Sequence, residues 1–205
     1  MLTKLKRRVQ SWIAFEARMA YRAGLTPNQI SLLGLVLAVA SGFLYWASSS
    51  HLIIKDSRIA LILAVLLLLS SGFCDALDGA LARIYGKETI FGGFLDSLLD
   101  RYADASIYCG LILGGLCDLS WGLTALVGSI LVSYSRARAE AAGVPMETVG
   151  LAERADRLMI IAVASILNLM WNQAIRWGII VLAILTNLTV LQRITHFSRK
   201  VKSKH

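Results

Sequence analysis

The sequence predicts an all-α integral membrane protein with six transmembrane helices and an N-terminal amphipathic helix at the membrane interface. Of its 205 residues, 57% are hydrophobic and 17% are charged, the mean hydropathy is +0.65, and charge-free stretches recur along the chain. This balance excludes a disordered chain and an ordinary soluble domain. A net charge of +8 would suit nucleic acid or an anionic membrane surface, and the hydrophobicity favours the lipid bilayer, with no nucleic acid as partner.

Residues 1–24 are expected to form a cytoplasmic juxtamembrane amphipathic helix. Basic residues alternate there with apolar ones such as Trp12, Phe15 and Met19, a pattern typical of a helix that lies in the headgroup plane. Gly24 then breaks the pattern. Either Thr26 or Asn28 can cap the next helix, and a proline between them suits its first turn.

The membrane domain is expected to cover residues 25–197, followed by a basic cytoplasmic tail at 198–205. Each predicted span is close to the roughly 20 residues that a helix needs to cross a bilayer. The charge-free stretches that define the spans are Ala23 to Ile54, Ile59 to Cys74, Ala105 to Cys117, Leu119 to Ser135, Leu158 to Ile175 and Trp177 to Gln192.

The distribution of basic residues predicts the orientation. Lysine and arginine gather before the first span, after the last span and in the loops that contain Arg83 and Arg154, whereas the opposite loops hold only Lys55, Arg58 and Arg176. Because cytoplasmic loops carry the excess of positive charge, both termini and these richer loops should face the cytoplasm. The sequence therefore predicts a multi-pass protein of the cell membrane.

Four aspartates occupy the adjoining ends of the second and third spans. Asp75 and Asp78 are three residues apart, and Asp96 and Asp100 are four apart, so each pair projects from one face of a helix. A short turn between the helices would bring the four carboxylates together. Unpaired carboxylates are costly in a membrane, and hard oxygen ligands suit Mg²⁺, Mn²⁺ or Ca²⁺. The spacing predicts a divalent metal site.

Two other interpretations of the aspartates remain open on these grounds. Arg83, Arg101 or Arg154 could pair with them as part of a helix bundle. Acids facing a bundle interior also mark ion pathways, so a divalent-cation transporter is a candidate of a different class. The acids cluster towards one end, however, and Asp56 and Asp118 are isolated in the opposite loops.

The aspartates belong to a longer pattern. It runs Asp75-Ala-Leu-Asp78-Gly79-Ala-Leu-Ala82-Arg83, eight residues, Gly92, three residues, Asp96, three residues and Asp100. Every fixed position resembles the signature of the CDP-alcohol phosphotransferases, integral membrane enzymes of phospholipid synthesis. The resemblance implies transfer of a phosphatidyl-type group from a CDP-lipid to an alcohol, with release of CMP.

The same resemblance implies roles for individual residues. A two-metal site, with Mg²⁺ or alternatively Mn²⁺, would be held by Asp75, Asp78, Asp96 and Asp100, and Asp100 would also be the catalytic base. Two metals would neutralise the diphosphate. The residues expected to bind the nucleotide of the CDP-lipid are Asn28, Gln29, Ile30, Ser31, Asp75, Asp78, Gly79, Ala82, Arg83 and Thr89.

Basic residues around the fourth to sixth spans indicate an acceptor that itself carries phosphate. These segments resemble the prokaryotic phosphatidylinositol-phosphate and archaetidylinositol-phosphate synthases, which implies inositol phosphate as the acceptor. Ser133, Arg136, Arg154 and Arg193 would bind its phosphate, although Arg136 stands where the bacterial branch is expected to have lysine. Glycerol-3-phosphate, the acceptor of a phosphatidylglycerol-phosphate synthase, remains open.

The family resemblance is the only basis for predicting the lipid donor and the oligomeric state. The donor could be CDP-diacylglycerol or CDP-archaeol, because an apolar groove would accept either set of chains. The family resemblance also implies a homodimer. Gly110 and Gly114 are small residues that could let helices approach closely, without identifying the interface.

Overall fold

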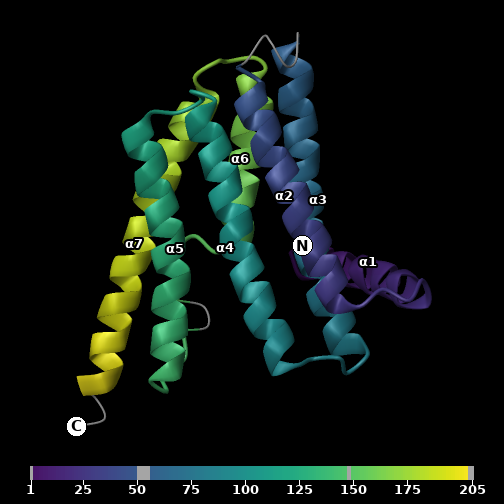
Figure 1. Cartoon of the computed structure of the whole chain (residues 1–205). Helices are drawn as coiled ribbons and strands as arrows, with labels where there is room; N and C mark the ends of the chain where they lie inside the picture. The colour runs from purple at the N-terminus through teal and green to yellow at the C-terminus, as the bar shows by residue number, and fades with distance from the viewer. Residues whose placement is uncertain (1, 50–55, 147–148, 203–205) are drawn as a thin grey trace.

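Helix α1 (Leu2–Arg22) is followed by six helices that alternate in direction along one bundle (Figure 1). The computed structural model describes residues 2–49, 56–146 and 149–202, with side chains from residue 12 onward, so Lys55 and residues 203–205 of the predicted tail lie outside it. Every regular element in these ranges is a helix. The six helices are α2 (Pro27–Ala47), α3 (Ser57–Ile84), α4 (Ile90–Leu113), α5 (Leu119–Ala141), α6 (Arg154–Asn168) and α7 (Ala174–Lys202).

Three of these helices are long and apolar enough to cross a membrane, within the described residues: α2, α3 and α7. Helix α4 carries three aspartates and Arg101, and α6 has only 15 residues. The outer surface of the bundle is nevertheless rich in exposed apolar side chains, including Leu33, Leu66, Val127 and Leu191. Exposed apolar surface of this extent is typical of contact with lipid.

The start of α2 settles which residue caps it. The Thr26 hydroxyl accepts a hydrogen bond from the Gln29 N–H at 3.4 Å, and the Gln29 side-chain oxygen accepts one from the Thr26 N–H at 2.9 Å. Pro27 occupies the first turn, where its missing N–H costs nothing. Since Thr26 is the cap, the side chain of Asn28 is not needed for it.

Two helix boundaries differ from the charge-free stretches. Helix α4 begins at Ile90, well before Ala105, because Thr89 caps it by accepting the Gly92 N–H at 2.9 Å. The stretch from Leu158 to Ile175 contains a helix end and a turn, since α6 ends at Asn168. The side-chain oxygen of Asn168 accepts a hydrogen bond from the Ile175 N–H at 3.3 Å. The charge-free stretches did not show this turn, because its polar residues Asn168, Asn172 and Gln173 carry no charge.

Small residues bring α2 and α4 into close contact. A Cβ added to Gly110 would collide with the backbone of Gly42, and one added to Gly114 would meet the carbonyl oxygen of Tyr45. These glycines therefore pack helices together inside a single chain. Around them, buried apolar side chains of α2 to α7 form one core, which includes Leu68, Ile107 and Leu182.

Candidate active site

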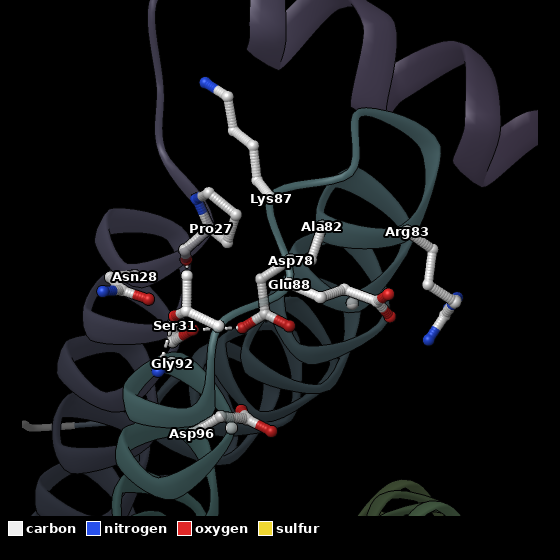
Figure 2. A pocket seen from close by; sticks show the side chains of 13 residues that line it. Pro27, Asn28, Ser31, Asp78, Ala82, Arg83, Lys87, Glu88, Gly92 and Asp96 are labelled. Carbon is white, nitrogen blue, oxygen red and sulfur yellow. Dashed lines mark hydrogen bonds between the residues drawn. The ribbon is translucent and has the colours of Figure 1, made fainter.

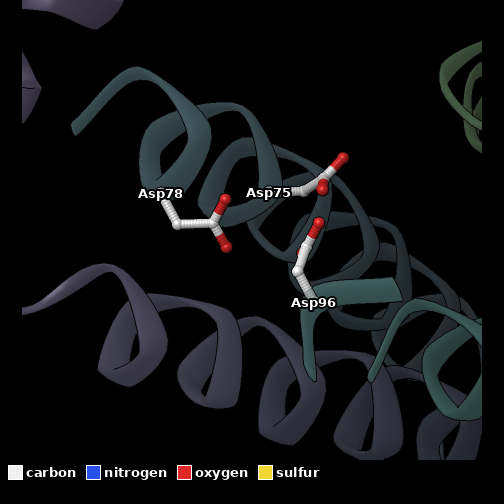
Figure 3. A group of neighbouring side chains, drawn as sticks. All are labelled: Asp75, Asp78 and Asp96. Carbon is white, nitrogen blue, oxygen red and sulfur yellow. The ribbon is translucent and has the colours of Figure 1, made fainter. Parts of the chain in front are cut away.

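Carboxylates from two helices meet near the turn that joins α3 to α4. Asp75 and Asp78 project from α3 and Asp96 from α4, and Figure 3 shows the three side chains directed towards one another. One oxygen of each lies within 4.8 Å of the others. The turn is short and includes Gly86 at a φ of +59°, a conformation that glycine adopts without strain. This turn allows the two aspartate-bearing faces to converge.

The chemistry of this cluster fits a divalent cation. Asp78 is only 5% exposed, and its carboxylate accepts a hydrogen bond from the Ser31 hydroxyl at 2.5 Å. Among the described residues, no lysine or arginine forms an ion pair with Asp78 or Asp96. Carboxylates without basic partners in such surroundings call for a cation, and oxygen ligands favour a hard one.

Arg154, at the start of α6, forms ion pairs with three aspartates. Its Nη1 lies 3.0 Å from Asp75 Oδ2 and 2.7 Å from Asp100 Oδ1, while its Nε lies 3.3 Å from Asp104 Oδ1. Of the arginines considered as partners from the sequence, Arg154 makes the closest contacts; Arg101 is 3.7 Å from Asp100. One guanidinium thus links α3, α4 and α6.

Asp100 lies apart from the three-carboxylate cluster but faces the same small void. This void, of about 10 Å³, is bordered by all four motif aspartates and by Arg154. Its size is close to that of one water molecule or ion. Two larger cavities adjoin the void. One of them is also lined by Ser31, Asp78 and Asp96, and the other is also lined by Asp75, Asp100 and Arg154.

The first larger cavity, of about 280 Å³, opens among the ends of α2, α3 and α4 (Figure 2). Most of the residues expected to bind the nucleotide line it. The residues of that set on its wall are Asn28, Ser31, Asp78, Gly79, Ala82, Arg83 and Thr89. Gln29 and Ile30 do not line it, because Gln29 serves the α2 cap and Ile30 is buried against α1 and α3. Asp75 borders the void and the second cavity instead.

Two motif glycines permit close approach at this cavity. The Arg83 guanidinium lies over Gly79, where a Cβ would come within 3.3 Å of Nη1. At Gly92, a Cβ would come within 3.2 Å of the Asn28 side-chain oxygen. Because neither glycine has a side chain, the Arg83 guanidinium and the Asn28 side-chain amide can lie at the cavity wall.

The second larger cavity, of about 300 Å³, lies between α4, α5, α6 and α7. All four residues expected to bind the acceptor phosphate line it, namely Ser133, Arg136, Arg154 and Arg193. Arg136 is exposed and pairs with Glu140 at 2.8 Å. Arg193 is buried and donates from Nε to the Val149 carbonyl at 2.9 Å and from Nη1 to the Val132 carbonyl.

A buried pair beside this cavity escaped the sequence analysis. Asp104 and Arg157 are 7% and 3% exposed, and Arg157 Nη2 lies 2.7 Å from Asp104 Oδ2. Asp104 continues the four-residue spacing of Asp96 and Asp100 along α4, and that spacing is the signal that could have found it. The pair fixes the start of α6, and therefore Arg154, against α4.

Residues 24–191 match the family model described as CDP-alcohol phosphatidyltransferase. The chain belongs to this family. The match includes the whole aspartate pattern, the void, the first cavity and every residue that lines the second cavity except Arg193. Membership of a membrane-enzyme family agrees with the apolar helices, so this CDP-alcohol phosphatidyltransferase is a membrane protein.

Curated relatives of this CDP-alcohol phosphatidyltransferase extend over almost its full length. The archaetidylinositol phosphate synthase of Pyrococcus horikoshii is 38% identical, with 98% of this chain and 99% of that protein covered. The enzyme of the same name from Methanothermobacter thermautotrophicus is 40% identical over 90% of this chain and 89% of its own length.

Solved structures of similar fold come from Mycobacterium tuberculosis. Its phosphatidylinositol phosphate synthase with CDP-DAG bound superposes with a TM-score of 0.76 at 30% identity, covering 90% of this chain and 92% of that one. The complex of the same enzyme with manganese and citrate also gives a TM-score of 0.76, at 30% identity and covering 90% and 88%.

Proposed function

We propose that this enzyme transfers the phosphatidyl or archaetidyl group of a CDP-lipid to inositol phosphate and releases CMP. The observation that carries the proposal is the position of the aspartates between two cavities with different linings. A CDP-lipid would place its nucleotide in the first cavity, beside Gly79 and Arg83. Inositol phosphate would occupy the arginine-lined second cavity. The names of the relatives from Pyrococcus and Methanothermobacter support this choice of acceptor.

The metal assignment rests on the three clustered carboxylates, of which Asp78 and Asp96 form no ion pair among the described residues. Asp75, Asp78 and Asp96 would hold one Mg²⁺, or Mn²⁺ in its place, and Asp100 would complete a second site together with carboxylates already in the cluster. Bound there, divalent ions would neutralise the diphosphate and polarise the bond to the CMP leaving group. The manganese in the mycobacterial complex supports a divalent ion in this fold.

Asp100 is assigned as the general base. It borders the void and the second cavity but not the first, so it lies on the acceptor side of the cluster. Its carboxylate would take the proton of the inositol hydroxyl as that oxygen attacks the lipid phosphorus. The bond from phosphorus to the CMP oxygen would break, and CMP would depart from the first cavity. Geometry must compensate for the weak basicity of a carboxylate.

The function is tested by supplying one acceptor at a time to the purified enzyme with CDP-lipid. Inositol phosphate should support metal-dependent CMP release, whereas inositol and serine should not. Preference for glycerol-3-phosphate would identify a phosphatidylglycerol-phosphate synthase instead. Metal flux into liposomes without CMP release would overturn the enzymatic assignment and favour a transporter. CDP-diacylglycerol and CDP-archaeol should be compared as donors in the same assay.

Arg136 and Arg138 provide a matched test of the acceptor cavity. Both lie on α5, but only Arg136 lines that cavity. We expect Arg136→Gln to raise the KM for inositol phosphate about tenfold, as loss of one charge-assisted phosphate contact implies, with little change in the KM for CDP-lipid. Arg138→Gln makes the same charge change and should leave both constants near their original values. Equal effects of the two substitutions would contradict the acceptor assignment.

The placement in the membrane is also part of the proposal. Six crossings by α2 to α7 agree with their alternating directions in Figure 1, if the charged ends of α4 and α6 lie at the cytoplasmic interface. Helix α1, with Trp12, Phe15 and Met19 exposed, would lie in the headgroup plane. Residues 1–24, 25–197 and 198–205 would then be the juxtamembrane helix, membrane domain and tail. Both termini and the active site would face the cytoplasm.

A homodimer remains the expected assembly. Because Gly110 and Gly114 are occupied by contacts within the chain, the interface should involve other residues. Cross-linking in native membranes would test this expectation.

A further inference from the structure

An aromatic contact joins α1 to the end of α3. The rings of Tyr21 and Tyr85 are stacked, with centroids 3.7 Å apart and planes 8° from parallel. The ammonium of Lys87 also lies over the Tyr21 ring, 4.7 Å from its centroid. The 3.7 Å separation of near-parallel rings is a close face-to-face stack, shorter than the roughly 4.5–7 Å of most aromatic pairs, and the 4.7 Å distance is typical of a cation–π contact. Tyr21 therefore contacts two residues of the segment that connects α3 to α4.

That segment is a wall of the first cavity. Lys87, Glu88 and Thr89 line the cavity, and the backbone between them and α3 is held by hydrogen bonds. Tyr85 donates its N–H to the Leu81 carbonyl at 3.2 Å, and Lys87 donates to the Ala82 carbonyl at 2.9 Å. In Figure 2 the Lys87 side chain extends away from Asp78. The stacked tyrosine rings therefore contact this segment on the side that faces away from the cavity.

Helix α1 is itself anchored where it makes this contact. Ala17 and Ala20 are buried in a small apolar cluster with Leu81 of α3, and Tyr85 packs against the same cluster. On the same helix, Trp12 and Phe15 remain exposed. One face of α1 is therefore fixed to the bundle, which makes it a firm support for the wall of the cavity.

We propose that Tyr21 and Tyr85 are positioning residues for the nucleotide of the CDP-lipid. Through their stack, α1 holds residues 85–89 at the distance from Gly79 and Arg83 that the nucleotide requires. Lys87 is kept on the Tyr21 ring, so its positive charge stays at the edge of the cavity and its stem forms part of the wall. This role rests on the proposed function, since it assigns the first cavity to the nucleotide.

The test compares ring removal with ring retention. Tyr21→Ala and Tyr85→Ala should each raise the KM for CDP-lipid by about 3- to 10-fold, the range expected for loss of one aromatic pair. The kcat and the KM for inositol phosphate should change little. Tyr21→Phe and Tyr85→Phe keep the stacked ring and should behave like the original enzyme. The affinity for CMP, measured by titration calorimetry in detergent, should fall in the alanine variants by the same factor.

The outcomes separate this proposal from the proposed function. Alanine variants with unchanged CMP affinity and unchanged KM for CDP-lipid would overturn it. So would a parallel loss of kcat and of affinity for both substrates, which indicates damage to the fold. If the original enzyme released no CMP with any acceptor, the proposed function would fail, while the CMP affinities would still decide whether the stack positions the nucleotide pocket.

Discussion

Asp100→Asn is expected to lower turnover by about 10²- to 10⁴-fold, the contribution typical of a positioned general base. The amide has the shape of the carboxylate but cannot accept the proton of the attacking hydroxyl. Asp100 does not line the first cavity, which is proposed to bind the nucleotide, so CMP and CDP-lipid should still bind measurably. Turnover is measured as CMP release, and binding by calorimetry with CMP.

Asp118→Asn is the matched control. Asp118 also pairs with an arginine, since Arg176 approaches its two carboxylate oxygens at 2.7 and 2.9 Å, but it precedes α5 at the opposite end of the bundle (Figure 1). Its substitution should leave turnover close to that of the original enzyme. Full activity in Asp100→Asn would remove Asp100 from the role of base.

Arg154→Ala should destabilise the protein and impair catalysis together. The guanidinium is the closest basic partner of Asp75 and Asp100 and also pairs with Asp104 at 3.3 Å, so its removal leaves carboxylates facing one another in a poorly solvated site. Removal of one partner from a buried ion pair costs about 3–5 kcal/mol. We expect about 3 kcal/mol here, because the side chain of Asp75 is 38% exposed and water reduces the penalty.

Thermal unfolding in detergent measures this loss. The Tm of Arg154→Ala should fall by several degrees, and added Mn²⁺ should restore part of it by supplying positive charge to the aspartates. Arg176→Ala breaks an exposed pair, which is worth about 0–1 kcal/mol, and should change the Tm little. A Tm for Arg154→Ala equal to that of the original protein would show that the guanidinium does not hold these helices together.

The aspartate cluster was predictable because its signal is local. Spacings of three and four residues fix which side chains share a helix face, and the short connection between α3 and α4 leaves few ways to arrange the two faces. The sequence therefore predicted that all four aspartates would converge; Asp75, Asp78 and Asp96 do so, whereas Asp100 lies apart and borders the same void. The sequence left open whether Arg83, Arg101 or Arg154 would pair with the acids; the structure pairs Arg154 with Asp75 and Asp100, while Asp78 and Asp96 form no ion pair within the described ranges.

Other features depend on packing that the sequence pattern does not encode. Gln29 and Ile30 sit beside Asn28 in the chain, but helical geometry turns one towards the Thr26 cap and the other into the core. The turn after Asn168 lies inside an uncharged stretch, so a division of the chain at charged residues does not show it. The stack of Tyr21 on Tyr85 joins two helices that are distant in sequence, and only the folded chain brings them together.

The most direct measurement is CMP release from CDP-lipid and inositol phosphate in liposomes after exhaustive chelation. The account predicts that chelation stops CMP release and that added Mg²⁺ or Mn²⁺ restores it. Asp78→Asn alters the most buried carboxylate of the cluster. This variant should not regain activity when the ion is added, and it should not bind Mn²⁺, as detected by electron paramagnetic resonance. Release that continues at an undiminished rate without divalent ions would contradict it.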